Sequence, residues 1–161
     1  MKDEINNSNA GCTANVVLIV QGTIYCANSG DSRSVVSEKG IVSPLSEDHK
    51  PENEIELTRV RKAGGEVIQG RVNGNLNLSR ALGDLEYKVN ENGGTDPKTF
   101  MITAFPDVSE RDFSSDISLI ILGCDGIWEC RSNQQIVDSF KEQNVVLKDQ
   151  CAKFLDSILA G

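Results

Sequence analysis

Basic charge and long apolar runs are both scarce in this sequence of 161 residues. Asp and Glu number 24 against 16 Lys and Arg, which gives a formal net charge of -8. This balance argues against binding to nucleic acids or anionic membranes, because both require basic patches. No stretch approaches the roughly 20 apolar residues of a membrane span, and the polar start lacks a signal-peptide apolar region. We therefore expect a cytoplasmic protein, with the nucleus as a second location.

Paired cysteine motifs and multiple histidines are missing as well. The five cysteines are an odd number and include no Cys-x-x-Cys pair, so neither a disulfide framework nor a zinc site is indicated. The single histidine, His49, excludes a site built on two histidines. Its polar loop favours a histidine bonded to its neighbours, with a general base or metal ligand as the alternative.

Strand-like segments dominate the first forty-odd residues, and helical patterns close the chain. Apolar runs separated by Gln21-Gly22 and Lys39-Gly40 predict a β-meander. Its strands are expected at residues 15–20, 23–28, 32–37 and 41–42, with further strands at 101–105 and 117–123. Strands grouped before helices favour an α+β fold, and residues 1–10 are expected to form a flexible lead-in.

Three helices are expected. Residues 52–63 place acids early and bases late, which suits the helix dipole, and Gly64-Gly65 can end the helix. Ser132 and Gln135 form a capping box ahead of a second helix. The third carries an apolar face composed of Leu147, Cys151, Phe154, Leu155, Ile158 and Leu159.

Asp125 follows the apolar run of residues 117–122. Such a run predicts a strand buried on both faces, and a carboxylate at its end needs a partner because an unpaired buried charge is very costly. A divalent cation would be a suitable partner. The alternative is an Asp that caps the turn at Trp128, whose side chain we expect to be buried under the strand end.

Asp31 lies in a Gly-flanked turn between two strand-like runs. By its local sequence it is a turn-forming residue, and its functional interpretation is a second carboxylate in the same metal site as Asp125. Arg80 and Asp84 belong to a segment rich in Gly, Arg, Asn and Asp. For them we favour a structural pairing of Arg with a carboxylate, with phosphate binding as the alternative.

Taken together, these segments resemble the metal-dependent serine/threonine protein phosphatases of type 2C. Seven motifs carry the resemblance: residues 11–14 (GCTA), 27–33 (ANSGDSR), 45–51 (LSEDHKP), 63–65 (AGG), 70–84 (GRVNGNLNLSRALGD), 105–108 (FPDV) and 124–128 (CDGIW). They stand in the family's order and at family-like spacing.

The resemblance implies a four-layer α-β-β-α sandwich of two antiparallel sheets flanked by helices. It also implies two Mg²⁺ or Mn²⁺ ions, a weaker third ion, and hydrolysis of phosphoserine and phosphothreonine in proteins by metal-activated water. Asp125 matches a catalytic metal ligand, and Asp31 with Asp125 resembles the third-metal site. Glu129 stands where many members have Asp, and residues 47–67 match a mobile flap.

The family's N-terminal metal-binding motifs and its last metal-binding Asp have no counterpart here. Residues 11–161 thus resemble a partial catalytic domain, and we expect this chain alone to bind metal weakly and to be weakly active or inactive. Unpaired strand edges would favour a dimer or strand-swapped oligomer. The alternative function is a non-catalytic pseudophosphatase or interaction module.

Overall fold

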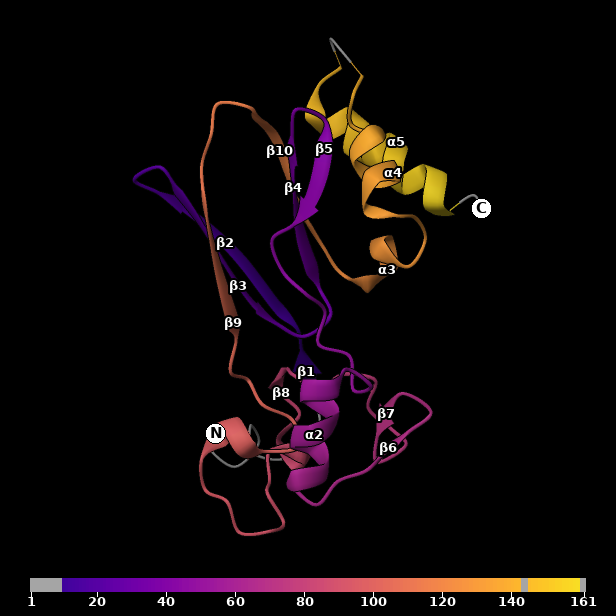
Figure 1. Ribbon diagram of the computed structural model, residues 1–161. Helices are drawn as coiled ribbons and strands as arrows, with labels where there is room; N and C mark the ends of the chain where they lie inside the picture. Colours follow the sequence, from indigo (N-terminus) through magenta and orange to yellow (C-terminus); the bar gives the residue numbers. More distant parts are fainter. Residues whose placement is uncertain (1–9, 143–144, 160–161) are drawn as a thin grey trace, which may run out of the picture.

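The computed structural model describes residues 10–142 and 145–159, so residues 1–9 of the expected lead-in lie outside the described part (Figure 1). Two hairpins begin the fold. Strands β2 (Ala14–Val20) and β3 (Thr23–Ser29) are joined by Gln21 and Gly22, both with positive φ angles of 50° and 81°. Strands β4 (Arg33–Glu38) and β5 (Ile41–Pro44) are joined by a second pair of positive-φ residues. Both turns have the geometry that matches the twist of paired strands, and both predicted hairpins are confirmed.

The hairpins belong to different sheets, so the predicted meander is wrong. One antiparallel sheet has the order β2-β3-β9 and the other the order β10-β4-β5, where β9 is Asp107–Asp112 and β10 is Ile117–Gly123. The chain crosses from one sheet to the other between β3 and β4. The alternation of apolar residues indicates a strand but does not indicate which strand pairs with it.

Two further strand predictions need correction. Residues 101–105 form no strand; Thr103 makes an isolated bridge with Arg80, and Met101 and Ile102 are buried in a core cluster instead. Strand β10 forms as predicted, but it lies at the edge of its sheet and none of its residues is fully buried. An apolar run fits a half-buried edge strand as well as a central one, so the run alone does not fix the burial.

Four helices are described: α2 (Glu54–Lys62), α3 (Asp125–Trp128), α4 (Asn133–Asp138) and α5 (Leu147–Leu159). Helix α2 ends at Lys62, and Gly64 follows with φ at 94°. The predicted capping box is confirmed, since the Ser132 hydroxyl accepts from the Gln135 amide while the Gln135 side chain accepts from the Ser132 amide. On α5, Phe154 and Ile158 pack inward while Leu147, Cys151, Leu155 and Leu159 stay exposed. No helix in the described ranges is long and apolar enough to cross a membrane.

Three apolar clusters hold these elements in layers. The first lies between the two sheets and contains Ile24, Cys26, Val36 and Leu45. The second joins the β10-β4-β5 sheet to the C-terminal helices through Val35, Trp128, Ile136, Val137 and Phe154. Figure 1 shows α4 and α5 beside β10-β4-β5, with β2-β3-β9 on the other side. The α+β sandwich is therefore present, and its described part contains three of the four layers.

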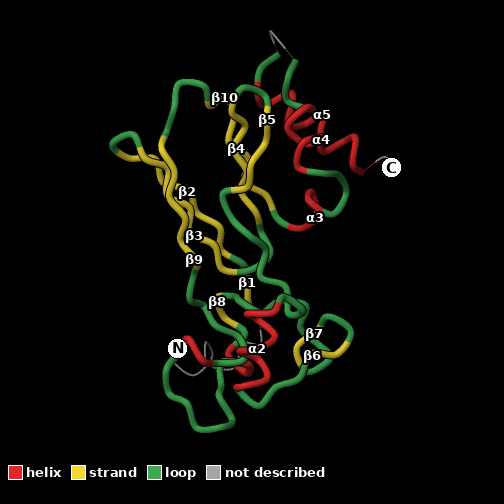
Figure 2. The backbone as a smooth tube through the Cα atoms, viewed as in Figure 1, coloured by secondary structure: helices red, strands yellow, loops and turns green. Residues whose placement is uncertain are grey.

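The third cluster builds a separate unit below the sheets, around α2. Its buried residues are Val60, Ala63, Val72, Ala81, Met101 and Ile102. Two short antiparallel pairs complete it: β6 (Val67–Ile68) with β7 (Arg71–Val72), and β1 (Gly11–Cys12) with β8 (Leu82–Gly83). Two 3₁₀ turns, η1 (Leu85–Tyr87) and η2 (Pro97–Thr99), interrupt its loops, which Figure 2 shows as long connections. We call residues 47–67 the flap, after the segment of the type 2C phosphatases that they resemble.

Candidate functional site

The turn that carries Asp31 is the crossing between the two sheets. Gly30 adopts φ at 118°, and a Cβ atom there would lie 2.4 Å from Thr13 Cγ2 and 3.1 Å from the Arg80 carbonyl oxygen. Only glycine fits this position without strain. The turn is further fixed by the Asn28 side chain, whose Nδ2 donates to the Gly30 carbonyl at 2.9 Å. Asp31 is thereby held in a buried position, with its side chain 4% exposed.

Asp125 is the first residue of α3, and only Cys124 separates it from the end of β10. The turn is tight, because a Cβ at Gly123 would lie 2.2 Å from Ile127 Cδ1. Trp128 is buried as predicted, and its Nε1 donates to the Gly123 carbonyl at 2.8 Å. The Asp125 side chain is half-buried and has no hydrogen bond or ion pair with any described residue. It is thus not the cap of the Trp128 turn, which is held through Trp128 itself.

Lys50 connects the two carboxylate segments and was not singled out from the sequence. Its Nζ lies 2.7 Å from Asp31 Oδ2 and 3.7 Å from Glu129 Oε1. Glu129 is one helical turn beyond Asp125, since its amide donates to the Asp125 carbonyl at 2.9 Å. Burial alone would lower the pKa of Lys50, but the hydrogen bond to Asp31 and the nearby carboxylates raise it. The Asp31 turn and helix α3 therefore meet at one end of the sandwich around a positive charge.

A second ion pair holds this corner together. Arg33 donates from Nε and Nη2 to the two carboxylate oxygens of Asp48, each at 2.8 Å, and from Nη1 to Asn133 at 2.7 Å. The Arg33 guanidinium also lies 5.5 Å from the Trp128 ring centroid. A bidentate pair of this kind defines the direction of both side chains. It ties the loop that carries Lys50 to β4 and to the start of α4.

The carboxylates of Asp31, Asp125 and Glu129 are suited to a hard divalent cation, but they do not form a complete metal centre. Carboxylate oxygens are the ligands that Mg²⁺ prefers, and the position of the Lys50 ammonium shows that Asp31 and Glu129 are arranged to neutralise a positive charge. Within residues 10–142 and 145–159, however, no group of three or more His, Cys, Asp or Glu residues is arranged to hold a metal. A cation bound at Asp31 or Asp125 would need water or other ligands to fill its coordination shell.

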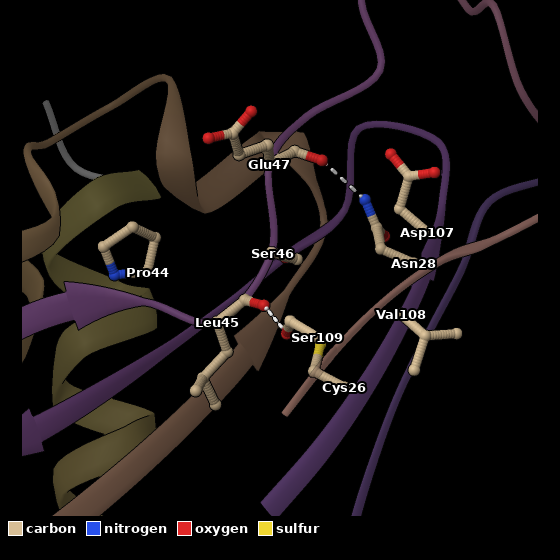
Figure 3. A pocket seen from close by; sticks show the side chains of 9 residues that line it. All are labelled: Cys26, Asn28, Pro44, Leu45, Ser46, Glu47, Asp107, Val108 and Ser109. Carbon is tan, nitrogen blue, oxygen red and sulfur yellow. Dashed lines mark hydrogen bonds between the residues drawn. The ribbon is translucent and has the colours of Figure 1, made fainter. Parts of the chain in front are cut away.

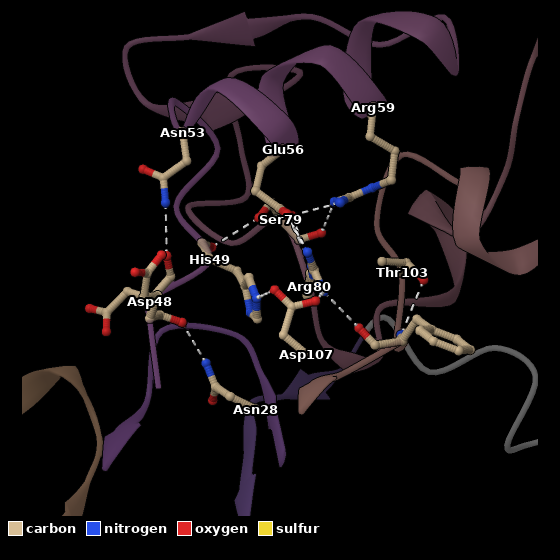
Figure 4. A network of polar contacts seen from close by, with 12 residues as sticks. Asn28, Asp48, His49, Asn53, Glu56, Arg59, Ser79, Arg80, Thr103 and Asp107 are labelled. Carbon is tan, nitrogen blue, oxygen red and sulfur yellow. Dashed lines mark hydrogen bonds and ion pairs between the residues drawn. The ribbon is translucent and has the colours of Figure 1, made fainter. Parts of the chain in front are cut away.

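Helix α2 of the flap is attached to this corner by a network of polar groups (Figure 4). Glu56, which is 2% exposed, accepts from Arg80 Nη2 at 2.6 Å, from Arg59 Nη1 at 2.7 Å and from Ser79 Oγ at 2.7 Å. Burial alone would raise the pKa of Glu56, but these partners lower it to about 2. Arg80 also donates to Asp107 Oδ1 at 2.6 Å. The pairing of Arg80 with carboxylates agrees with the structural role favoured from the sequence.

His49 and Asp84 also occupy structural positions. His49 is bonded to its neighbours, as favoured above: Nδ1 accepts from the Gly30 amide at 3.1 Å and Nε2 lies 3.1 Å from Asp107 Oδ2. Asp84 has a left-handed backbone with φ at 48°, and burial raises the pKa of its carboxyl. Its carboxylate lies against Gly11, where a Cβ would approach within 2.2 Å. Arg80 therefore has Glu56 and Asp107 as its partners and not Asp84.

A cavity of about 320 Å³ opens between the two sheets behind this corner (Figure 3). Its lining combines residues of β3 and β9 with the end of β5 and the loop after it: Cys26, Asn28, Pro44, Leu45, Ser46, Glu47, Asp107, Val108 and Ser109. Asn28 closes one side, because its Nδ2 donates to the Glu47 carbonyl at 2.9 Å. Neither Asp31 nor Asp125 lines the cavity, so it is distinct from the candidate metal site.

Comparison with known proteins agrees with this arrangement. Residues 1–160 match the family described as Protein phosphatase 2C. The chain is 45% identical over 157 residues to Protein phosphatase 2C homolog 3 of Schizosaccharomyces pombe, covering 98% of this chain and 37% of that protein. It is 47% identical over 154 residues to Probable protein phosphatase 2C 6 of Paramecium tetraurelia, covering 94% of this chain and 52% of that protein.

Solved structures are similar as well. A phosphatase from Toxoplasma gondii superimposes with a TM-score of 0.77 at 32% identity, covering 86% of this chain and 44% of the other. A sex determining protein of C. elegans gives a TM-score of 0.74, also at 32% identity, covering 95% of this chain and 38% of the other. The chain thus spans from about a third to about half of the length of these proteins. On this evidence, the chain belongs to the protein phosphatase 2C family.

Proposed function

We propose that this chain supplies part of the catalytic site of a metal-dependent protein serine/threonine phosphatase. The observation that carries the proposal is the meeting of Asp31 with the Asp125–Glu129 segment around one positive charge, at 2.7 Å and 3.7 Å from Lys50 Nζ. A hydrolase of phosphate esters needs carboxylates that hold cations, because charge develops on the phosphoryl oxygens and must be neutralised by those cations. The substrates proposed are proteins that carry phosphoserine or phosphothreonine.

The residues have separate tasks in this proposal. Asp125 and Asp31 would hold Mg²⁺ or Mn²⁺, two ions in the intact site and a weaker third one near Asp31. The bound metals supply an activated water and neutralise the transferred phosphoryl group. Asp125 is open to a ligand because no described residue occupies its carboxylate. Lys50 balances the charge of Asp31, and the Arg33–Asp48 pair fixes the loop on which Lys50 lies.

The donor set predicts weak metal binding and low activity for this chain by itself. With Asp31 and Asp125 as the proposed ligands, water must provide most of the coordination shell, and Mg²⁺ or Mn²⁺ would be held weakly. The non-catalytic alternative is not favoured, because a pseudophosphatase has no chemical need for carboxylates gathered at this corner. Residues 11–161 would then be a partial catalytic domain, and we place the protein in the cytoplasm or nucleus.

The test is hydrolysis of para-nitrophenyl phosphate and of a phosphothreonine peptide in the presence of Mn²⁺, combined with Mn²⁺ calorimetry. We expect Asp125→Ala to abolish whatever hydrolysis the chain supports and to reduce Mn²⁺ binding. Glu54→Gln, an exposed carboxylate on α2, is the matched control and should change neither. Mn²⁺ binding that is the same in wild type and Asp125→Ala would contradict the proposal.

We also propose that the chain associates with a second copy of itself. The edge strands of both sheets, β2 and β9 in one and β5 and β10 in the other, have no further strand beside them among the described residues. Unpaired strand edges are templates for pairing with another chain. The exposed apolar side chains of β2 lie at one of these edges, and they favour β2 as the contact.

A further inference from the structure

We propose that His49 is a positioning residue: its ring holds the backbone just before Asp31 and connects that turn to helix α2. The inference rests on the proposed role of Asp31 as a metal ligand. It goes beyond that role because it identifies what keeps Asp31 in place and by which path helix α2 can influence it. Figure 4 shows His49 beside Asp107, with Arg80 and Glu56 beyond it.

His49 satisfies both backbone groups of Gly30. The Gly30 amide donates to His49 Nδ1 at 3.1 Å, and the His49 amide donates to the Gly30 carbonyl at 3.0 Å. His49 is 4% exposed, so these bonds are shielded from water. Gly30 immediately precedes Asp31, and its φ of 118° lies outside the usual range for other residues. Loss of the ring acceptor would leave a buried amide without a partner and loosen the turn.

The other ring nitrogen links His49 to helix α2. Because Nδ1 accepts a hydrogen bond, the neutral ring carries its hydrogen on Nε2, which donates to Asp107 Oδ2 at 3.1 Å. Asp107 Oδ1 accepts from Arg80 Nη1 at 2.6 Å, and Arg80 forms a bidentate pair with Glu56 of helix α2. A continuous series of hydrogen bonds thus runs from the flap helix, through Asp107 and the His49 ring, to the amide next to Asp31.

The same contacts exclude a direct chemical role for the ring. Both nitrogens are already engaged, and the side chain is buried, so neither nitrogen is free to exchange a proton with substrate. The His49 backbone is held independently, since Ser79 Oγ donates to the His49 carbonyl at 2.9 Å. Replacing the ring therefore removes the two ring contacts while the Ser79 contact to the backbone remains.

Two substitutions separate the two ring contacts. In His49→Asn the amide oxygen can take the place of Nδ1 and accept from Gly30, but nothing reaches Asp107. In His49→Gln the longer amide can reach Asp107, but no atom takes the place of Nδ1. The first readout is hydrogen exchange of the Gly30 amide in the full chain, with the Val36 amide in the centre of β4 as the internal reference. The second is broadening of the Asp31 amide signal by Mn²⁺.

We expect Gly30 exchange to be about five- to tenfold faster in His49→Gln, the factor that corresponds to one buried hydrogen bond, with Val36 unchanged. In His49→Asn, exchange at Gly30 should be as slow as in the wild type, and Mn²⁺ should broaden the Asp31 signal as in the wild type. Equal Gly30 exchange in wild type and His49→Gln would overturn the inference, as would equal acceleration in both variants. If Mn²⁺ broadens no signal in the wild type, the proposed function fails, while the exchange data still decide the role of His49.

Asp107→Ala tests the path to helix α2. The Asp107 side chain is 70% exposed, so the fold should tolerate its removal, and Arg80 retains Glu56 and the Phe105 carbonyl as partners. Without Asp107 the ring loses the contact that orients it, and we expect Gly30 exchange to accelerate about two- to fivefold, less than in His49→Gln. Unchanged Gly30 exchange in this variant would overturn the proposed connection to helix α2.

Discussion

At the scale of single residues, charge pairing explains how Glu56 and Arg80 can be buried. Glu56, Arg80 and Arg59 form one such group, in which each charge has a partner of opposite sign. Burial of an ion pair brings little net stability, but removal of one partner is expensive because it leaves the other charge uncompensated. The group therefore holds the flap in one arrangement, and a substitution that removes one of its charges should destabilise the fold.

The lowered pKa of Glu56 predicts sensitivity to acid. Its carboxyl has a pKa of about 2 in the folded chain against an ordinary value of 4.5. A lowered pKa stabilises the fold above the ordinary value, and this stability is lost as the pH falls from about 4.5 towards 2. The shift corresponds to roughly 3 kcal/mol. Urea unfolding at pH 6 and at pH 3 should show the loss.

Glu56→Gln should reduce this acid dependence and destabilise the chain at pH 6 by about 3–5 kcal/mol, because Arg59 loses its paired carboxylate and Arg80 keeps only Asp107. Glu54→Gln, on the same helix but exposed, should leave both quantities nearly unchanged. An acid dependence that is identical in wild type and Glu56→Gln would show that other carboxyl groups cause it.

At the scale of the elements, the turns between strands differ in what they require from glycine. At Gly22, in the β2–β3 hairpin, φ is 81° and no atom lies within 4 Å of the position that a Cβ would take. At Gly30, between β3 and β4, φ is 118° and the same position meets Thr13 and the Arg80 carbonyl. The first turn therefore needs glycine for its backbone conformation alone, and the second needs it for space as well.

This difference predicts two different costs for the same substitution. Gly22→Ala should lower the free energy of unfolding by about 1–2 kcal/mol, the strain of a left-handed residue. Gly30→Ala should add about 1–3 kcal/mol of overpacking to a comparable strain. Urea unfolding of the two variants measures both values under the same conditions. Equal losses would mean that Thr13 and the Arg80 carbonyl can move away without cost.

At the scale of the whole molecule, the two sheets are covered unequally. Helices α4 and α5 pack on the outer side of β10-β4-β5. On the β2-β3-β9 sheet, exposed apolar side chains include Val16, Leu18, Val20, Tyr25 and Val108. Through the strand register Val16, Leu18 and Val20 alternate along β2, and Leu18 stands opposite Tyr25. A continuous apolar face of this kind favours association.

The proposed self-association can be tested at this face. Leu18 is 58% exposed, so Leu18→Lys should leave the stability of the single chain within about 0.5 kcal/mol while reducing the mass measured by light scattering at high concentration. Ile41→Lys, at a 72% exposed position on β5, is the matched control and should leave the mass unchanged. A wild-type mass equal to one chain at all concentrations would contradict the proposal.

Local signals in the sequence were sufficient for most individual elements. Gln21-Gly22 and Lys39-Gly40 predicted the two hairpins, and the Ser132–Gln135 capping box predicted the start of α4. The errors concern long-range pairing. The β3 and β4 strands were expected to be neighbours, and β10 was expected to be buried on both faces. Residues 101–105 were expected as a strand, although Met101 and Ile102 lie in the core beneath α2.

The sequence by itself determined the hairpin turns, the helix ends, the family resemblance and the carboxylates Asp31 and Asp125 as candidate ligands, because each depends on residues close together in the chain or on a motif. Tertiary structure alone decided which strands share a sheet, that Lys50 stands between Asp31 and Glu129, and that His49 joins the Gly30 turn to Asp107. These contacts join residues 19 to 79 positions apart. No local pattern encodes such pairs, because they form only when the packing of both sheets and the flap brings the side chains together.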